Sequence, residues 1–427
     1  MKAGELIQKI KEGDFDEKFL DIYVDRESAA LQQERYQRLL DEYIKAFGND
    51  EVGIYSAPGR TEIGGNHTDH QHGHVLAAAI NKDAIAVTSP SDDDLIRLIS
   101  DGYPLIEVDI KSLEPDKKDE GTTKALIRGV LCNLKERGCE IGGFKAYVTS
   151  DVLIGAGLSS SAAFENLIGT VISYLYNGGS IPAETIAMAG QYAENVHFGK
   201  PCGLMDQMAS AVGGLVHIDF KDPADPVIEK TEFDFEEKGW SLCITDTKGS
   251  HADLTPEYAA VPAEMKSVAE YLGKGFLADV SEKDIMDNIS QIRKKCGDRA
   301  LLRALHFCGE TKRALLESEA LKEGKLDEFL RLVKESGDSS FKYLQNVYAP
   351  KAPADQGVSV GLCVSSLVLR ERGASRVHGG GFAGTIQAWV PHDMTAAYKE
   401  AMDKVFGKGA CVKLSVRKYG GIEVTGL

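Results

Sequence analysis

The strongest constraint on the fold lies in residues 151–175, which have the sequence DVLIGAGLSSSAAFENLIGTVISYL. An apolar strand runs into glycines at positions 155 and 157, three serines follow, and apolar residues at helical spacing continue to Leu175. Glycines let a backbone approach an anion closely, and the free N–H groups and positive dipole end of a helix then bind it. This segment predicts a strand, a phosphate-binding loop and a helix, in that order.

The serines at 159–161 allow two interpretations. A serine in the first turn can cap the helix, or its hydroxyl can bind Mg²⁺. Three serines in a row exceed what a cap requires. No Walker A pattern occurs in the chain, so any bound ATP is held without a P-loop lysine.

A second glycine-rich segment, RVHGGGFAGTIQAWV, has Gly379, Gly381 and Gly384 at the spacing of a dinucleotide fingerprint. That fingerprint requires a helix after the glycines, whereas TIQAWV has the pattern of a strand. On its own, the segment predicts a tight turn before a strand.

Residues 56–75 form a dense set of hydrogen-bond donors and acceptors between two predicted strands. The set comprises Arg60, Glu62, Asn66, His67, Asp69, His70, His72 and His74. The four histidines raise a transition-metal site as an alternative, but no cysteine lies nearby and no helical H-x-x-x-H pair sets a coordination geometry. A polyhydroxyl ligand suits the loop better, because each of its hydroxyls needs a partner.

A third polar group lies in AENVHFGKPCGLMDQMASAVGG, residues 193–214. Glu194 falls near the end of an amphipathic helix, and Asp206 lies in a glycine-bounded loop before an apolar stretch. Asp206 is therefore either an ordinary helix N-cap or a carboxylate of the site.

The chain has 427 residues, 43% of them hydrophobic, which is enough for two domains with separate cores. The patterns predict helices at 31–47, 123–136, 159–176 and 183–198, and strands at 52–57, 75–88, 142–150, 226–235 and 240–247. We expect an α+β protein of two lobes with a ligand in the cleft between them. The expected division is a helical extension at 1–45, a first domain at 46–225 and a second at 226–427.

Charge limits the partners. With 49 Lys and Arg against 65 Asp and Glu, the formal net charge is −16, so nucleic acid and anionic membranes are not expected to bind. The start of the chain is charged where a signal peptide needs an apolar run, and we expect a cytoplasmic protein. The eight cysteines include no C-x-x-C pair, which indicates reduced thiols.

Three segments in order, PGR…HTD, GAGLSSSAA and GGGFAG, resemble the signature motifs of the GHMP kinases. The resemblance extends from about residue 47 to residue 390. Within that superfamily, APGRTEIGGNHTDHQHG is similar to the sugar-binding signature of the galactokinase family, and PCGLMDQ to the loop that carries its catalytic aspartate. GSHADLTPEYAAV and RALHFCGETKR are similar to two further segments of that family.

The resemblance implies a ribosomal-protein-like N-terminal lobe, a ferredoxin-like C-terminal lobe and ATP-dependent phosphorylation of a sugar's anomeric hydroxyl. Asp206 would take the proton from that hydroxyl, and Arg60 would keep the carboxylate ionised and offset phosphoryl charge. Ser161 and Glu194 match the Mg²⁺ ligands of the superfamily. The implied sugar-binding residues are Glu62, Asn66, His67, Asp69 and Tyr258, and the implied ATP-binding residues are Gly155, Ala156, Gly157, Leu158, Ser159, Ser160, Ser161, Gly380 and Gly381.

Departures from the family pattern leave the sugar open. This chain has Asn66 where galactokinases usually have glutamate, Glu62 where they usually have asparagine, and His70 where they usually have tyrosine. Either the amide at position 66 favours another substituent, or Glu62 restores the carboxylate to the same pocket. Galactose is the first expectation, and an amino sugar or a pentose is the second.

A non-catalytic sensor of sugar and ATP is the third interpretation, although Asp206 and Arg60 are both present. The sequence does not predict the oligomeric state.

Overall fold

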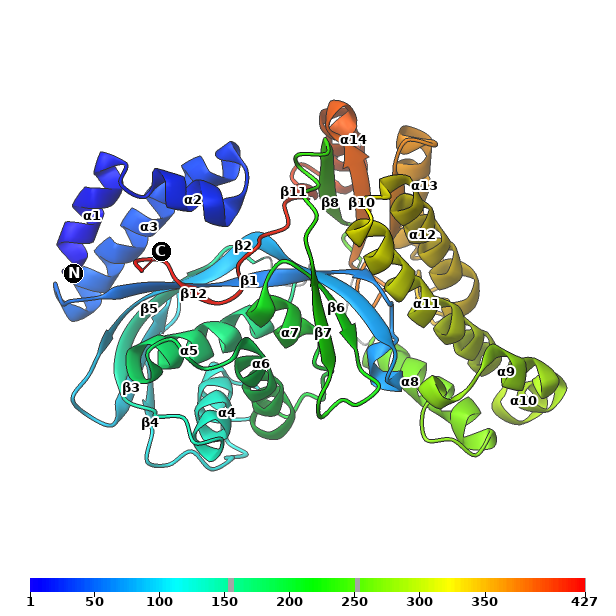
Figure 1. The fold of residues 1–427 in the computed structure, drawn as a ribbon, viewed down its shortest axis with the longest axis horizontal. Coiled ribbons are helices and arrows are strands. Elements are labelled where there is room, and N and C mark those ends of the chain that lie inside the picture. Colours follow the sequence, from blue (N-terminus) through cyan, green and yellow to red (C-terminus); the bar gives the residue numbers. More distant parts are fainter. Residues whose placement is uncertain (153–156, 250–253, 427) are drawn as a thin grey trace.

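The structure is a computed structural model that describes residues 1–152, 157–249 and 254–426. Two β-sheets lie side by side along the long axis, each covered by helices, which confirms the predicted α+β class (Figure 1). Within these ranges, no helix combines the length and apolar character needed to cross a bilayer. All eight cysteines are free, as expected.

Three N-terminal helices cover one face of the first sheet: α1 (Ala3–Glu12), α2 (Asp16–Tyr23) and α3 (Arg26–Phe47) (Figure 1). The helix predicted at 31–47 is α3, which begins earlier because the Asp25 side chain accepts a hydrogen bond from the Ser28 N–H. Apolar side chains of all three helices pack against β1 and β2 in one buried cluster. The expected extension is therefore part of the folded body.

The first sheet has the strand order β12-β1-β2-β5-β3-β4, with β6 beside β2 and β7 beside β6. Its strands are β1 (Gly53–Gly64), β2 (His74–Pro90), β3 (Leu95–Ser100), β4 (Ile106–Asp109), β5 (Phe144–Ser150), β6 (Leu215–Asp219), β7 (Val227–Thr231) and β12 (Ile422–Glu423).

Strand β1 is longer than predicted and carries two site candidates. It continues to Gly64, so Arg60 and Glu62 lie on a strand and not in a loop. The register with β2 shifts between Pro58 and Arg60 and again between Glu62 and Gly64, which interrupts regular alternation. Both polar side chains are buried and paired, so hydrophobic alternation could not locate this part of the strand.

Four helices cover the opposite face of the first sheet (Figure 1): α4 (Thr123–Glu136), α5 (Ser160–Asn177), α6 (Ala183–Tyr192) and α7 (Met205–Val212). The helices predicted at 123–136 and 159–176 are confirmed as α4 and α5. The helix predicted at 183–198 is α6 followed directly by a π-helical segment, Ala193–Phe198.

The second sheet has the strand order β11-β8-β10-β9. Its strands are β8 (Trp240–Asp246), β9 (Ala374–Val377), β10 (Thr385–Pro391) and β11 (Cys411–Leu414), and its helices are α8 (Thr255–Tyr271), α9 (Glu282–Asp287), α10 (Ile289–Cys296), α11 (Asp298–Lys322), α12 (Leu326–Ser339), α13 (Gly357–Leu369) and α14 (His392–Phe406). TIQAWV is the strand β10, as predicted.

The chain joins the two sheets at more than one place. Strand β7 follows residue 225 yet pairs with β6 of the first sheet, and the C-terminal β12 returns to pair with β1. The first sheet thus includes strands from beyond residue 225, and the domain boundary predicted at that residue stays a prediction. The loop after β1 lies against the glycine turn between β9 and β10, where polar side chains meet.

Candidate active site

Arg60 and Asp206 form a two-pronged ion pair at the centre of the candidate site. Arg60 Nε lies 2.7 Å from Asp206 Oδ1, and Nη2 lies 2.6 Å from Oδ2. Arg60 is 6% exposed, whereas the Asp206 side chain is 34% exposed, so the carboxylate remains open to a ligand. Asp206 lies in the first turn of α7, but the N-cap is Leu204, so the interpretation of Asp206 as an N-cap is wrong.

The same arginine binds the end of the phosphate-loop segment. Arg60 Nη1 donates to the Gly157 carbonyl, and the Arg60 backbone N–H donates to Leu158 O at 3.1 Å. Gly59 permits this close approach, because a Cβ there would lie 2.8 Å from Leu158 O. Gly155 and Ala156 lie outside the described residues.

Ser159 occupies the N-cap position of α5, but its side chain makes no capping hydrogen bond. Its backbone has φ +56°, a left-handed conformation that is rare for serine, and its hydroxyl donates to Asp206 Oδ2. The helix begins at the next residue, and its first-turn N–H groups have no intrahelical acceptors. Ser160 and Ser161 are partly exposed in that turn. The loop therefore orients the carboxylate and leaves a positive helix end beside it.

Two buried carboxylates below this helix end suit a hard cation. Glu165 is four residues after Ser161 on α5, and its Oε1 has no hydrogen-bond partner. Burial raises the pKa of Glu165, and the neighbouring Glu194 raises it further. Glu194 is 3% exposed and lies 3.7 Å from Lys200 Nζ. These oxygens fit the preferences of Mg²⁺. The sequence did not lead us to predict Glu165 as a site residue, although helical spacing places it one turn after Ser161.

Of the four predicted sugar-binding residues on β1 and the sugar loop that follows it, His67 and Asp69 are partly exposed, whereas Glu62 and Asn66 are buried. Burial lowers the pKa of His67 to about 4, so the ring is neutral at pH 7. His67 Nε2 lies 3.1 Å from the Gly380 carbonyl, which can only accept, so we assign the proton to Nε2 and leave Nδ1 as an acceptor. A Cβ on Gly203 would lie 2.2 Å from Asp69 Oδ2, which places this loop against the segment leading to Asp206.

Three successive carbonyls of the glycine turn accept hydrogen bonds from predicted sugar-site residues. Asn66 Nδ2 donates to Gly379 O at 2.7 Å, His67 lies against Gly380 O as above, and the Tyr258 hydroxyl donates to Gly381 O at 3.0 Å. The sugar loop, the turn and α8 therefore form one hydrogen-bonded unit.

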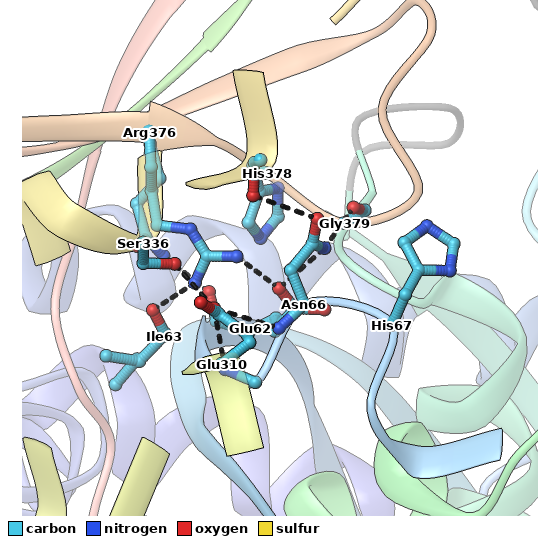
Figure 2. A network of polar contacts seen from close by, with 12 residues as sticks. Glu62, Ile63, Asn66, His67, Glu310, Ser336, Arg376, His378 and Gly379 are labelled. Carbon is cyan, nitrogen blue, oxygen red and sulfur yellow. Dashed lines mark hydrogen bonds and ion pairs between the residues drawn. The ribbon is translucent and has the colours of Figure 1, made fainter. Parts of the chain in front are cut away.

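Glu62 and Asn66 lie deeper, in a network that joins the two sheets (Figure 2). Glu62 Oε1 accepts from Arg376 Nη2 at 2.7 Å and from Asn66 Nδ2 at 3.0 Å. Glu310 Oε1 accepts from the backbone N–H groups of Gly65 and Asn66, each at 3.2 Å. Arg376 and Glu310 lie within RVHGGGFAGTIQAWV and RALHFCGETKR, but neither was predicted as a site residue, because nothing local distinguishes either from an ordinary surface charge.

The histidines do not form a metal site. Among the described residues, no group of three or more His, Cys, Asp and Glu side chains could hold a metal ion. His72 stacks on Phe276 with ring centroids 3.6 Å apart, and His74 stacks on His217 at 5.1 Å. His74 Nδ1 also lies 3.1 Å from His217 Nε2, so both histidines have neighbouring rings as partners.

His70 makes the stability of the protein sensitive to acid. Both its ring nitrogens are buried without a hydrogen-bond partner, and burial lowers its pKa to about 3. Because the unfolded chain takes up this proton near pH 6.5, the contribution to stability is complete above that pH and is lost as the pH falls. We expect His70→Phe to gain about 2 kcal/mol in free energy of unfolding, relative to wild type, on going from about pH 7.5 to about pH 5.

Urea unfolding of both proteins at the two pH values measures this difference, since every other titrating group is common to the pair. Parallel pH dependence of the two proteins would contradict it.

Two family models match the chain: the galactokinase galactose-binding signature over residues 41–90 and the GHMP kinase N-terminal domain over residues 125–214. Curated galactokinases from Glaesserella parasuis and Streptomyces coelicolor are each 31% identical, over 86% of this chain and 92% of each relative.

Solved structures share the fold. Lactococcus lactis galactokinase complexed with galactose matches with a TM-score of 0.75 at 24% identity, over 90% of this chain and 98% of that one. A mevalonate kinase matches with a TM-score of 0.58 at 17% identity, over 86% of this chain and 99% of that one. The two-lobed architecture expected from the motifs is confirmed.

Proposed function

This chain belongs to the galactokinase family of GHMP kinases, and we propose that it transfers the γ-phosphoryl group of ATP to the anomeric hydroxyl of galactose. The observation that carries the proposal is the Arg60–Asp206 pair, in which a partly exposed carboxylate lies beside the phosphate-loop segment and the N-terminus of α5. A base next to an anion-binding helix end is what phosphoryl transfer to a hydroxyl requires.

In the proposed reaction, the sugar hydroxyl oxygen forms a bond to the γ-phosphorus while the bond from that phosphorus to the ADP oxygen breaks. Asp206 accepts the hydroxyl proton, and its two oxygens are oriented by Arg60 and Ser159. Arg60 also offsets the charge that spreads over the transferring group. ADP and galactose 1-phosphate leave.

The phosphates would bind the N–H groups of the α5 N-terminus, in the segment from Gly157 to Ser161. Gly155 and Ala156 stay predicted members of this loop. Gly380 and Gly381 would border the site from the second sheet, since their carbonyls are already held by His67 and Tyr258.

Ser161 and Glu194 would hold the Mg²⁺ ion that accompanies ATP, with Glu165 next to them. When bound, the ion would neutralise charge on the β- and γ-phosphates. Its fit rests on the unpartnered oxygen of Glu165 and the crowded pair of buried carboxylates.

For the sugar, His67 Nδ1 and the Asp69 carboxylate would accept hydrogen bonds from ring hydroxyls, and Tyr258 would border them. A hydroxyl that loses its partner leaves buried site groups unpaired, so related sugars should be separated strongly.

A coupled ADP-release assay with MgATP across a panel of free sugars tests the proposal. Galactose should exceed glucose by at least about a hundredfold in kcat/KM. If an amino sugar or a pentose gives ADP release and galactose gives none, that sugar is the substrate and galactose is not. Sugar binding without any ADP release would favour the sensor.

The metal ligands have their own prediction. In Glu194→Gln, the Mg²⁺ concentration that gives half-maximal rate should rise by at least about tenfold, because Mg²⁺ takes few protein ligands and each contributes. Rate measurements over a Mg²⁺ titration check this, with the exposed Glu184→Gln on α6 as the matched control. Ser161→Ala should behave like Glu194→Gln, and unchanged Mg²⁺ dependence in both would remove them as ligands.

A cytoplasmic location, and the expectation that no nucleic acid or membrane binds, stay predictions from the charge and the chain start.

A further inference from the structure

We propose that Glu62, Asn66 and Arg376 form a clasp between the two sheets that positions the sugar loop, and that none of the three contacts the sugar. This proposal rests on the proposed function, because the expected effect of the clasp is on the binding and turnover of galactose. It reassigns Glu62 and Asn66 from ligand contacts to positioning residues and adds Arg376.

Burial separates these residues from the ligand-facing ones. Asn66 and Arg376 are 0% exposed and Glu62 is 4% exposed, whereas His67 and Asp69 on the same loop are partly exposed. A side chain that no water can reach cannot touch a sugar unless the loop rearranges. Figure 2 shows the Glu62 carboxylate directed at Arg376 and Asn66, with His67 apart from the network.

The hydrogen-bonding capacity of the Asn66 side chain is already used. Its amide nitrogen donates to Glu62 Oε1 at 3.0 Å and to Gly379 O at 2.7 Å, which accounts for both protons. Its oxygen accepts from Asn346 Nδ2 at 2.9 Å and from Ser340 Oγ at 3.4 Å. No donor or acceptor of this side chain remains for a sugar hydroxyl.

The Asn66 backbone is held as well. His306 Nε2 lies 2.9 Å from Asn66 O, and Glu310 accepts from the Asn66 N–H at 3.2 Å. The next residue, His67, has φ +59°, a left-handed conformation that is uncommon for residues other than glycine. The clasp therefore sets the direction in which the His67 ring leaves the chain.

Arg376 explains why positions 62 and 66 carry these residue types. Its Nη2 lies 2.7 Å from Glu62 Oε1, and its Nη1 donates to Ile63 O. Burial raises the pKa of Glu62, and the Arg376 guanidinium opposes that rise. With a carboxylate fixed at 62, a second one at 66 would face both Glu62 and the Gly379 carbonyl, with no proton to donate to either. An amide at 66 satisfies both acceptors.

A double-mutant cycle tests the clasp. Asn66→Asp removes both amide donors, and we expect kcat/KM for galactose to fall by about tenfold to a hundredfold, with the KM for ATP within about twofold of wild type. Adding Glu62→Gln supplies a donor to the new carboxylate, so the double variant should recover at least about fivefold over Asn66→Asp. The hydrogen bond from residue 66 to the Gly379 carbonyl is still absent in the double variant, so the recovery should be partial.

A second variant guards against misfolding of the first. Arg376→Lys keeps the positive charge but loses the planar guanidinium that donates to both Glu62 and Ile63. It should raise the KM for galactose severalfold without changing the KM for ATP. Tyr36→Phe is the matched control: it removes a buried hydrogen bond to Tyr23 in the N-terminal helices and should lower stability without altering either KM.

The outcomes separate the two proposals. If wild type does not phosphorylate galactose, the proposed function fails and the positioning role fails with it. If wild type is active but the losses of Asn66→Asp and Glu62→Gln multiply in the double variant, Asn66 contacts the sugar itself and only the clasp is overturned. Equal changes in the two KM values for Arg376→Lys would also overturn it.

Discussion

The Asp206→Asn protein should fold, bind galactose and turn it over at least about a hundredfold more slowly than wild type. An amide cannot accept the hydroxyl proton, and it cancels the charge that faces Arg60. The two hydrogen bonds from Arg60, at 2.7 and 2.6 Å, would become one hydrogen bond to the amide oxygen and one clash of donors. Steady-state kcat in the ADP-release assay measures the loss, and calorimetric titration measures galactose binding.

The control is Asp225→Asn, the same substitution at an exposed carboxylate before β7, which should leave kcat unchanged. If Asp206→Asn kept more than about a tenth of wild-type kcat, Asp206 would not be the base.

Replacing Arg60 should have the largest effect of all. Arg60→Met removes the cation that contacts both the Asp206 carboxylate and the Gly157 carbonyl, and we expect kcat to fall by about a thousandfold. Three functions are lost together: orientation of the base, charge stabilisation of the transferring group, and attachment of the phosphate-loop segment to β1.

Arg60→Lys distinguishes the contribution of the positive charge from that of the bidentate geometry, because lysine supplies a cation but not the paired guanidinium donors. Its kcat should lie between those of wild type and Arg60→Met. The variant with both Arg60→Met and Asp206→Asn should be little slower than the worse single variant, since the two residues act as a unit. Losses that multiply would mean that the two side chains act independently, contrary to the bidentate pair.

Sequence periodicity located two helices closely, although both are buried on nearly all sides along most of their length. Helix α4 has its predicted bounds, and α5 differs from prediction by one residue at each end. The same reasoning ended β1 too early, because beyond residue 58 the strand carries the buried polar side chains of Arg60 and Glu62, whose partners are Asp206 on α7 and Arg376 on β9. Alternation of apolar and polar residues reports burial against water, and it cannot report burial against a polar partner.

By itself, the sequence determined the local chemistry: glycines that allow a close backbone approach, a helix start that binds anions, and an arginine and an aspartate of the right types. These properties depend on neighbouring residues along the chain. Tertiary structure alone decided that Arg60 meets Asp206 across 146 positions, and that Arg376 pairs with Glu62 across 314. Because such pairs form only when separate elements pack together, the residue types at 62 and 66 suggested a ligand contact in the sequence and form a buried clasp in the fold.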